Sequence, residues 1–86
     1  MEKTPKIIRV YDNGGKTQDR YTVYYGEPYE RSKTLYDCLT MDKTPFYPLG
    51  FCQHLTGCLG RHNGKQITVK DLPKDCQAVL KNEGLI

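Results

Sequence analysis

The 86-residue chain contains no tryptophan, only two phenylalanines and no long apolar run, and its mean hydropathy is -0.69. A helix that spans a bilayer needs about 20 consecutive apolar residues, so the sequence excludes a helical membrane protein and we expect no membrane partner. The segment from Met1 to Lys6 also lacks the apolar stretch of a secretory signal. We therefore expect a cytoplasmic protein.

The chain is also too short for two hydrophobic cores, because typical domains run from about 50 to 250 residues. No stretch has the composition of a linker between two cores. Apolar residues make up 37% of the chain, and Ile, Val, Leu and Tyr recur along it, which argues against disorder. The sequence predicts one folded domain over residues 1–86.

Acidic residues are absent between Asp42 and Asp71, although the chain as a whole carries a net charge of only +3. The basic side chains of that interval are Lys43, Arg61, Lys65 and Lys70, with both histidines. One local segment is therefore more basic than the total suggests, which is typical either of a surface that binds anions or of ordinary solvated lysines.

Two runs rich in β-branched and aromatic residues, Lys6–Tyr11 and Arg20–Tyr25, flank an Asn-Gly-Gly turn and predict a β-hairpin. Thr34–Met41 predicts a third strand. The period of two places Leu35, Leu39 and Met41 on one face with Asp37, for which we expect a place at the rim. Lys65–Lys70 predicts a further strand with Ile67 and Val69 pointing inward.

Between these strands, Thr44–Gly50 holds two prolines and predicts an ordered aromatic turn. Phe51–Leu55 fits a short strand or a helical turn equally well. Near the C-terminus, Pro73 suits a first helical position, and Cys76, Val79 and Leu80 form an apolar stripe. The predicted fold class is α+β: a small antiparallel sheet or partly open barrel of about four or five strands, packed by one C-terminal helix.

Chemistry is concentrated between Cys52 and His62. Four cysteines without an export signal favour free thiols or metal ligands over disulfides. Two thiolates and two imidazoles are the donors that structural zinc prefers, so Cys52, His54, Cys58 and His62 are candidate zinc ligands. The alternating spacing is not that of a usual zinc finger, and the cysteines also fit as small buried apolar residues.

A Cys–His nucleophilic pair can be drawn from the same stretch, but no flanking motif orients it, and so small a domain has little room for a substrate cleft. Asn13-Gly14-Gly15-Lys16 lacks the spacing of a phosphate-binding loop. We therefore expect no enzymatic activity and no catalytic residues.

Seven tyrosines interleaved with arginines resemble the stacking surfaces of single-strand binders, although tyrosines also serve as amphipathic core and rim residues. The candidate residues for binding nucleic acid or a protein partner are Arg20, Tyr21, Tyr24, Arg61, His62 and Lys65. Exposed Tyr and Arg are equally the anchors of protein interfaces, so both kinds of partner stay open.

Several short motifs carry a resemblance to a known group of proteins. They are Val10–Thr17, Asp19–Val23, Pro48–Phe51 with Gln53-His54, and Gly64-Lys65 leading to Asp71–Pro73 and Asp75-Cys76. The chain resembles a functionally unassigned family of short proteins from gut bacteria, their phages and mobile elements. The resemblance implies a cytosolic accessory protein and assigns no catalytic residue.

Three functions are consistent with these observations. The first is a non-enzymatic accessory protein that binds nucleic acid through a basic, tyrosine-rich surface. The second is an interaction or inhibitor module of a phage or mobile element that acts on a host protein. The third is a small zinc-stabilised domain. The sequence leaves the oligomeric state open.

Overall fold

The computed structural model describes residues 6–46, 48 and 50–86, with the backbone alone for Arg61. The strands are β1 (Ile7–Asp12), β2 (Tyr21–Tyr25), β3 (Leu35–Met41), β4 (Cys52–Cys58) and β5 (Lys65–Ile67). Two 3-10 helices, η1 (Arg61–Asn63) and η2 (Val69–Asp71), and one α-helix, α1 (Lys74–Asn82), complete the described elements.

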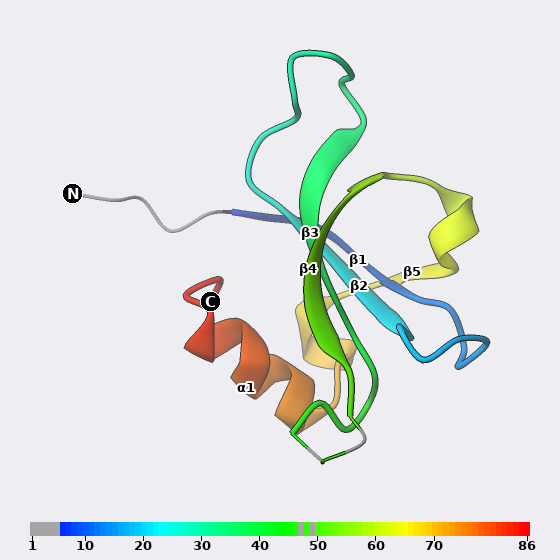
Figure 1. The fold of residues 1–86 in the computed structure, drawn as a ribbon, viewed down its shortest axis with the longest axis vertical. Coiled ribbons are helices and arrows are strands. Elements are labelled where there is room, and N and C mark those ends of the chain that lie inside the picture. The colour runs from blue at the N-terminus through cyan, green and yellow to red at the C-terminus, as the bar shows by residue number, and fades with distance from the viewer. Residues whose placement is uncertain (1–5, 47, 49) are drawn as a thin grey trace.

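The five strands form one antiparallel sheet in the order β4-β3-β2-β1-β5 (Figure 1). The first four strands follow one another as a meander. The chain then leaves β4 at one edge of the sheet and returns as β5 at the opposite edge. This open sheet with one C-terminal helix confirms the α+β class predicted from the sequence.

One face of the sheet, here called the helix face, packs against α1 and carries the larger core. Its buried side chains are Val10, Tyr21, Val23, Leu39 and Met41 from the sheet and Leu72, Cys76, Val79, Leu80 and Leu85 from the C-terminal segment. The strand faces and the helical stripe are those that the apolar periodicity predicts. Burial of such side chains is the main stabilising contribution to a domain of this size.

The opposite face, here called the crossover face, carries a smaller buried cluster of Tyr11, Tyr24 and Cys38. Leu59, from the connection between β4 and β5, packs against this cluster. The rings of Tyr11 and Tyr24 meet edge to face with their centroids 5.8 Å apart. Because both faces are covered, aromatic residues that look amphipathic in the sequence are buried on both sides.

A bulge in β1 explains why two consecutive isoleucines serve different cores. The pairing of β1 with β2 shifts between Ile7 and Arg9, which leaves Ile8 as an extra residue. Ile7 packs against the core of the helix face, whereas Ile8 packs against the cluster of the crossover face. The alternation resumes at Val10 on the helix face.

The last predicted strand is shorter than the sequence indicates. Strand β5 ends at Ile67, and the expected continuation to Lys70 is wrong because η2 begins at Val69. The cause is a local capping box, in which the Asp71 carboxylate accepts hydrogen bonds from the backbone N–H and the hydroxyl of Thr68, at 2.9 and 3.0 Å. Ile67 and Val69 nevertheless both pack inward, as expected.

Helix α1 begins at Lys74, so Pro73 is the N-cap and not the first helical residue that the sequence predicts, because its ψ of 152° is extended. The buried Cys76, Val79 and Leu80 confirm the predicted stripe. Gly84 adopts a positive φ of 75° just beyond the helix, the left-handed conformation in which a glycine commonly ends a helix. Among the described residues, no helix is long and apolar enough to cross a membrane. The predicted turn at 44–50 includes Tyr47 and Leu49, which lie outside the described residues.

Candidate interaction site at the free edge of β4

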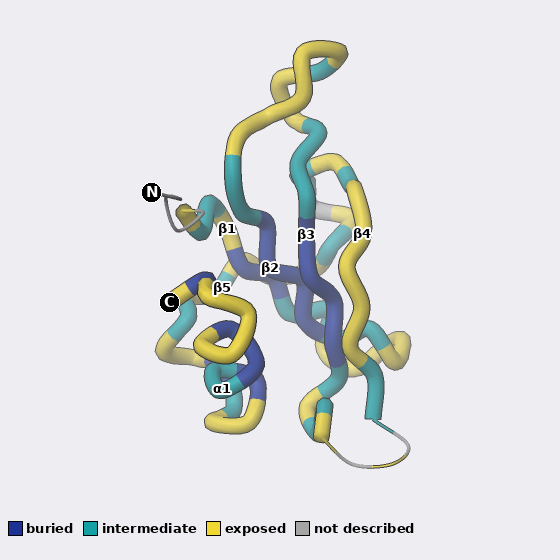
Figure 2. Tube along the Cα trace, turned by 60° about the vertical axis from the view of Figure 1, so that its left-hand side comes forward, coloured by how far each residue is buried: buried dark blue, intermediate teal, exposed yellow. Residues whose placement is uncertain are grey.

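Strand β4 is the longest exposed segment of regular structure in the described chain. It pairs with β3 along its whole length, from Cys52 opposite Met41 to Cys58 opposite Leu35, without a break in register. The sheet order places β4 at the edge, and no strand of the described chain lies on its other side. Figure 2 shows β4 as a mostly exposed strand beside β3, whose second half is buried.

Every residue of β4 is exposed except the half-buried Gly57. Leu55 keeps 42% of its surface accessible, which makes it one of few large apolar side chains exposed among the described residues. Leu55 points to the crossover face, because its partner on β3 is Cys38, a member of the cluster there. The middle of the free edge is therefore apolar on that side.

The hydrogen bonds at the two ends of β4 reveal which backbone groups face outward. Asp42 N–H donates to the Phe51 carbonyl at 3.0 Å, and Leu59 N–H donates to the Thr34 carbonyl at 2.9 Å. In an antiparallel pair the hydrogen-bonded residues alternate, so the odd-numbered residues from 51 to 59 bond to β3. The N–H and C=O groups of Cys52, His54 and Thr56 therefore point to the free edge.

One carbonyl at the end of β4 is already occupied. The Tyr24 hydroxyl donates to the Cys58 carbonyl at 2.9 Å, and the Asn63 amide donates to the same oxygen at 3.2 Å. Burial raises the pKa of Tyr24 to about 12, so the hydroxyl keeps its proton and its role as donor. The last outward carbonyl of β4 that is available to another chain is therefore that of Thr56.

Strand β4 lacks the sequence features that usually protect an edge strand from pairing with another chain. Natural proteins blunt such edges with charged residues, proline or a bulge. The sequence of β4, CQHLTGC, contains no Lys, Arg, Asp, Glu or Pro, and its pairing with β3 is regular. Strand β4 therefore offers unprotected backbone hydrogen-bonding groups to another chain.

His54 links the edge strand to the rest of the molecule on the helix face. Its Nδ1 lies 2.9 Å from the Tyr25 hydroxyl, and its Nε2 lies 3.3 Å from a carboxylate oxygen of Glu83 at the end of α1. The His54 and Tyr25 rings meet edge to face at 6.1 Å. These contacts hold β4 against α1 without covering its free edge.

The four candidate zinc ligands are not assembled into a site. Cys52, His54 and Cys58 are distributed along β4, and at about 3.3 Å per residue the two cysteines stand at opposite ends of the strand. His62 lies on η1. Tetrahedral zinc needs its donors within about 2.0–2.3 Å of one point, and the described residues hold no cluster of three or more metal-ligating side chains.

Two of the predicted partner-binding residues are buried. Tyr21 retains 5% of its surface in the core of the helix face, and Tyr24 retains 2% in the cluster of the crossover face. Their rings are therefore unavailable for stacking on bases. Tyrosine alternation predicts which face each ring occupies, but not that both faces are covered.

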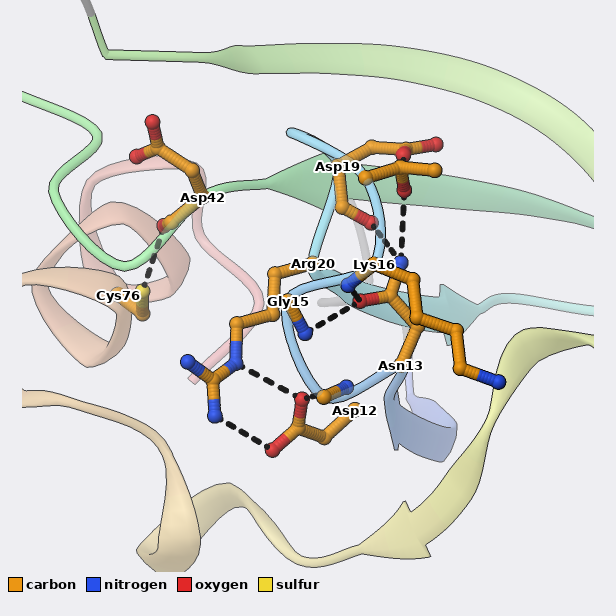
Figure 3. A network of polar contacts seen from close by, with 10 residues as sticks. Asp12, Asn13, Gly15, Lys16, Asp19, Arg20, Asp42 and Cys76 are labelled. Carbon is orange, nitrogen blue, oxygen red and sulfur yellow. Dashed lines mark hydrogen bonds and ion pairs between the residues drawn. The ribbon is translucent and has the colours of Figure 1, made fainter.

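Arg20 is engaged in the network that organises the β1–β2 loop (Figure 3). Its guanidinium donates two hydrogen bonds to the Asp12 carboxylate, at 2.9 and 3.3 Å, and lies over the Tyr21 ring at 5.2 Å. The Asn13 side chain accepts from the backbone N–H groups of Gly15 and Lys16. The loop is thus folded by its own side chains.

His62 and Lys65 are exposed, whereas the Arg61 side chain lies outside the described part of the structure. His62 lines an open cleft of about 340 Å³ together with Asn63 from η1 and Lys16 and Thr17 from the β1–β2 loop. Lys65 is the register partner of Asp12 where β5 pairs with β1. The structure therefore brings His62 close to Lys16, which the sequence argument did not select.

The four thiols divide into two exposed and two buried groups. Cys52 and Cys58 are exposed at the ends of β4, and Cys38 and Cys76 are buried in the two cores. Burial raises the pKa of Cys38 to about 11 and that of Cys76 to about 12. Cys76 also donates to the Asp42 carbonyl at 3.2 Å, which confirms its predicted place in the core.

No family model, curated protein or solved structure matches this chain.

Proposed function

We propose that this chain is a non-enzymatic binding module that recognises an extended polypeptide segment by strand addition along β4. The observation that carries the proposal is the uncharged, unprotected edge whose outward backbone groups belong to Cys52, His54 and Thr56. Strand addition draws its affinity from main-chain hydrogen bonds and its specificity from alternate side chains.

The two sides of the edge favour different partner side chains. On the crossover face, the exposed Leu55 lies beside Gly57, where a Cβ would already contact Tyr24 and Cys38. Leu55 is therefore the apolar side chain that the edge offers to a partner on this face. On the helix face, His54 and Thr56 present polar groups. The recognised segment should therefore alternate apolar and polar residues, and its affinity should depend little on salt because β4 carries no charge.

The experiment is selection of peptide ligands from a displayed random library on the immobilised protein, followed by fluorescence anisotropy of the selected peptides. Thr56→Pro removes an outward N–H and places the proline ring on the free edge, where proline is tolerated by the fold. We expect this substitution to abolish binding. Thr56→Ala, the matched control, keeps the N–H and should bind within a few-fold of wild type.

Amide hydrogen exchange locates the bound peptide independently of the substitutions. Binding along the edge should slow exchange at His54 and Thr56, whose N–H groups face outward, and leave Gln53 and Leu55 unchanged because they already bond to β3. Peptides that bind Thr56→Pro as tightly as wild type, or that protect a different segment, would contradict the proposal.

A second candidate function is binding of nucleic acid at the cleft between η1 and the β1–β2 loop. The observation that favours it is the presence of Lys16 and His62 on one cleft with amide and hydroxyl groups of Asn63, Thr17 and Thr22. Such a mixed polar surface suits phosphate and sugar contacts. Asp19 also lines the cleft and opposes an anion.

Anisotropy with labelled single- and double-stranded oligonucleotides at rising salt tests this second function. Phosphate neutralisation makes affinity fall steeply with salt, and Lys16→Ala should weaken binding to every sequence. Lys81→Ala, an exposed lysine on α1 away from the cleft, is the control. Absence of binding at low salt, or equal effects of the two substitutions, would exclude the cleft.

A further inference from the structure

We infer that the strand that fits the free edge of β4 is β4 of a second copy of this chain, paired antiparallel about a two-fold axis at Leu55. The inference rests on the proposed function, because it names the segment that adds to the edge. It follows from the length, hydrogen-bonding pattern and side chains of β4.

Leu55 is the middle residue of the strand that runs from Cys52 to Cys58. A two-fold axis at Leu55 therefore pairs every residue of β4 with one of its copy. His54 comes opposite Thr56 of the second chain, and Cys52 comes opposite Cys58. An axis at His54 or at Thr56 leaves residues at one end of each strand without a partner.

The hydrogen-bonding pattern agrees with this register. His54 and Thr56 both direct N–H and C=O groups to the free edge, so the two residues can exchange a full pair of bonds across the axis. Cys58 contributes its N–H to the Cys52 carbonyl, since its own carbonyl already accepts from Tyr24. Leu55 then occupies a non-hydrogen-bonded position.

The side chains of this register are compatible on both faces. At a non-hydrogen-bonded position the Cα atoms of a pair approach to about 4.5 Å, so the two exposed Leu55 side chains cover one another on the crossover face. Gln53 comes opposite Gly57, which has no side chain of its own. His54 and Thr56, both polar, meet on the helix face, where Glu83 already accompanies His54.

Charge does not oppose the self-pairing. Like charges directly opposite each other destabilise a strand pair, and β4 contains no Lys, Arg, Asp or Glu, while His54 comes opposite Thr56 rather than a second histidine. Two copies of an uncharged edge therefore meet without repulsion across the pair, whereas most natural edges prevent this pairing with lysines. A two-fold contact also uses the same surface on both copies and closes on itself.

The contact is small. One seven-residue strand pair extends about 20 Å and buries less surface than the roughly 1,200 Å² of standard stable interfaces. The dimer should therefore be reversible and depend on concentration. Sedimentation velocity should show the mass of a monomer at low concentration and a rising dimer fraction as concentration increases.

Cysteine crosslinking tests the register. Cys52→Ser leaves Cys58 facing a serine of the copy, and Cys58→Ser leaves Cys52 in the same situation. With a short bismaleimide, neither variant alone should give covalent dimer above background. An equal mixture of the two variants should give covalent dimer, because in a mixed pair Cys58 of the Cys52→Ser chain faces Cys52 of the Cys58→Ser chain. The double variant Cys52→Ser/Cys58→Ser measures the background from Cys38 and Cys76.

Two results would overturn the inference. One is crosslinking of either single variant alone as efficient as that of the mixture, which indicates another contact. The other is a monomer at every concentration by sedimentation. If the chain is monomeric but selected peptides still bind at β4, the second copy is the wrong occupant and the proposed function stands. If neither a dimer nor peptide binding at β4 is detected, the inference and the proposed function are both wrong.

Discussion

Tyr24 connects the buried crossover face to the exposed end of β4. Its ring packs in the cluster with Tyr11 and Cys38, and its hydroxyl holds the Cys58 carbonyl at 2.9 Å. A buried hydroxyl that finds a partner contributes both packing and a hydrogen bond. The position of the edge strand therefore depends on a residue that is itself inaccessible.

Tyr24→Phe removes this hydrogen bond and keeps the ring. We expect the free energy of unfolding to fall by about 1 kcal/mol, measured by urea denaturation, and amide exchange to accelerate near the end of β4. Tyr36→Phe, whose ring packs against the same cluster, is the control and should have less effect. Equal losses in the two variants would show that the bond to Cys58 contributes nothing.

Asp12 makes the stability depend on pH. The hydrogen bond from Arg20, with help from the Gly14 N–H, holds the pKa of Asp12 below its ordinary value of 3.8. A carboxyl whose pKa is lowered by folding stabilises the protein above its unfolded pKa, and this stabilisation is lost as pH falls through the folded pKa. Asp12→Asn should therefore lower the melting temperature at neutral pH.

The difference between wild type and Asp12→Asn should shrink as the solution is acidified below the ordinary pKa of the carboxyl. Thermal melts at neutral and acid pH measure it. Glu27→Gln, which removes the carboxylate of an exposed residue outside the loop network, is the control. A constant difference at both pH values would assign the effect of Asp12 to packing rather than to its charge.

Residue patterns predict faces better than they predict exposure. The period of two in the run Arg20–Tyr25 puts Tyr21, Val23 and Tyr25 on one face of a strand and Tyr24 on the other, and the structure has this arrangement. The predicted binding role of Tyr21 and Tyr24 required an open face. Only the path of the connection that carries Leu59 decides that the second face is covered, and no local periodicity encodes that path.

At the level of elements, the turn before β5 depends on one glycine. Gly64 has a φ of 103°, and a Cβ added there would lie 2.6 Å from Asn13 Cα and closer still to the Asp12 carbonyl oxygen. Backbone atoms cannot move aside as a flexible side chain would. The edge position of β5 beside β1 therefore requires glycine at this site for space as well as for conformation.

Gly64→Ala should destabilise the fold more than Gly14→Ala. Gly14 also has a positive φ, 79°, but a Cβ there meets nothing within 4 Å. The left-handed conformation alone costs about 1–2 kcal/mol, which is the loss expected for Gly14→Ala in chemical denaturation. Any further loss in Gly64→Ala measures the contact with β1, and equal losses would contradict the close approach.

The elements that the sequence predicted are those with strong periodicity. The first three strands and α1 have β-branched or apolar residues at regular intervals. Strand β4 has one threonine and one leucine among Cys, Gln, His and Gly, so its state stayed open between strand and helical turn. Its conformation is set by pairing with β3, which is a tertiary interaction. The candidate site was therefore invisible from the local sequence.

For the whole molecule, the distribution of thiols gives a direct test of the fold. Cys52 and Cys58 are exposed and Cys38 and Cys76 are buried, with the pKa of both buried thiols raised by burial. Brief alkylation with iodoacetamide, followed by mass spectrometry, should modify the two cysteines of β4 first. The other two should react only after denaturation. Rapid modification of Cys76 would place it outside the core.

Alkylation also distinguishes free thiols on β4 from a zinc site. Because the four candidate ligands are spread over β4 and η1, a chelator should change neither the melting temperature nor the alkylation pattern. A zinc-stabilised domain would unfold on chelation and expose all four thiols. Unfolding by a chelator would restore the zinc hypothesis and contradict the arrangement described for β4.

The two edges of the sheet differ in length, since β4 has seven residues and β5 only three. If two copies pair through β4 as inferred above, the chain is a monofunctional monomer in the terms of polymer chemistry, because it then has one associating edge instead of two. Growth through paired edges therefore stops at two copies, and raising the concentration should yield more pairs rather than fibres. Lengthening β5 would supply the second associating edge and turn a self-limiting association into an open-ended one.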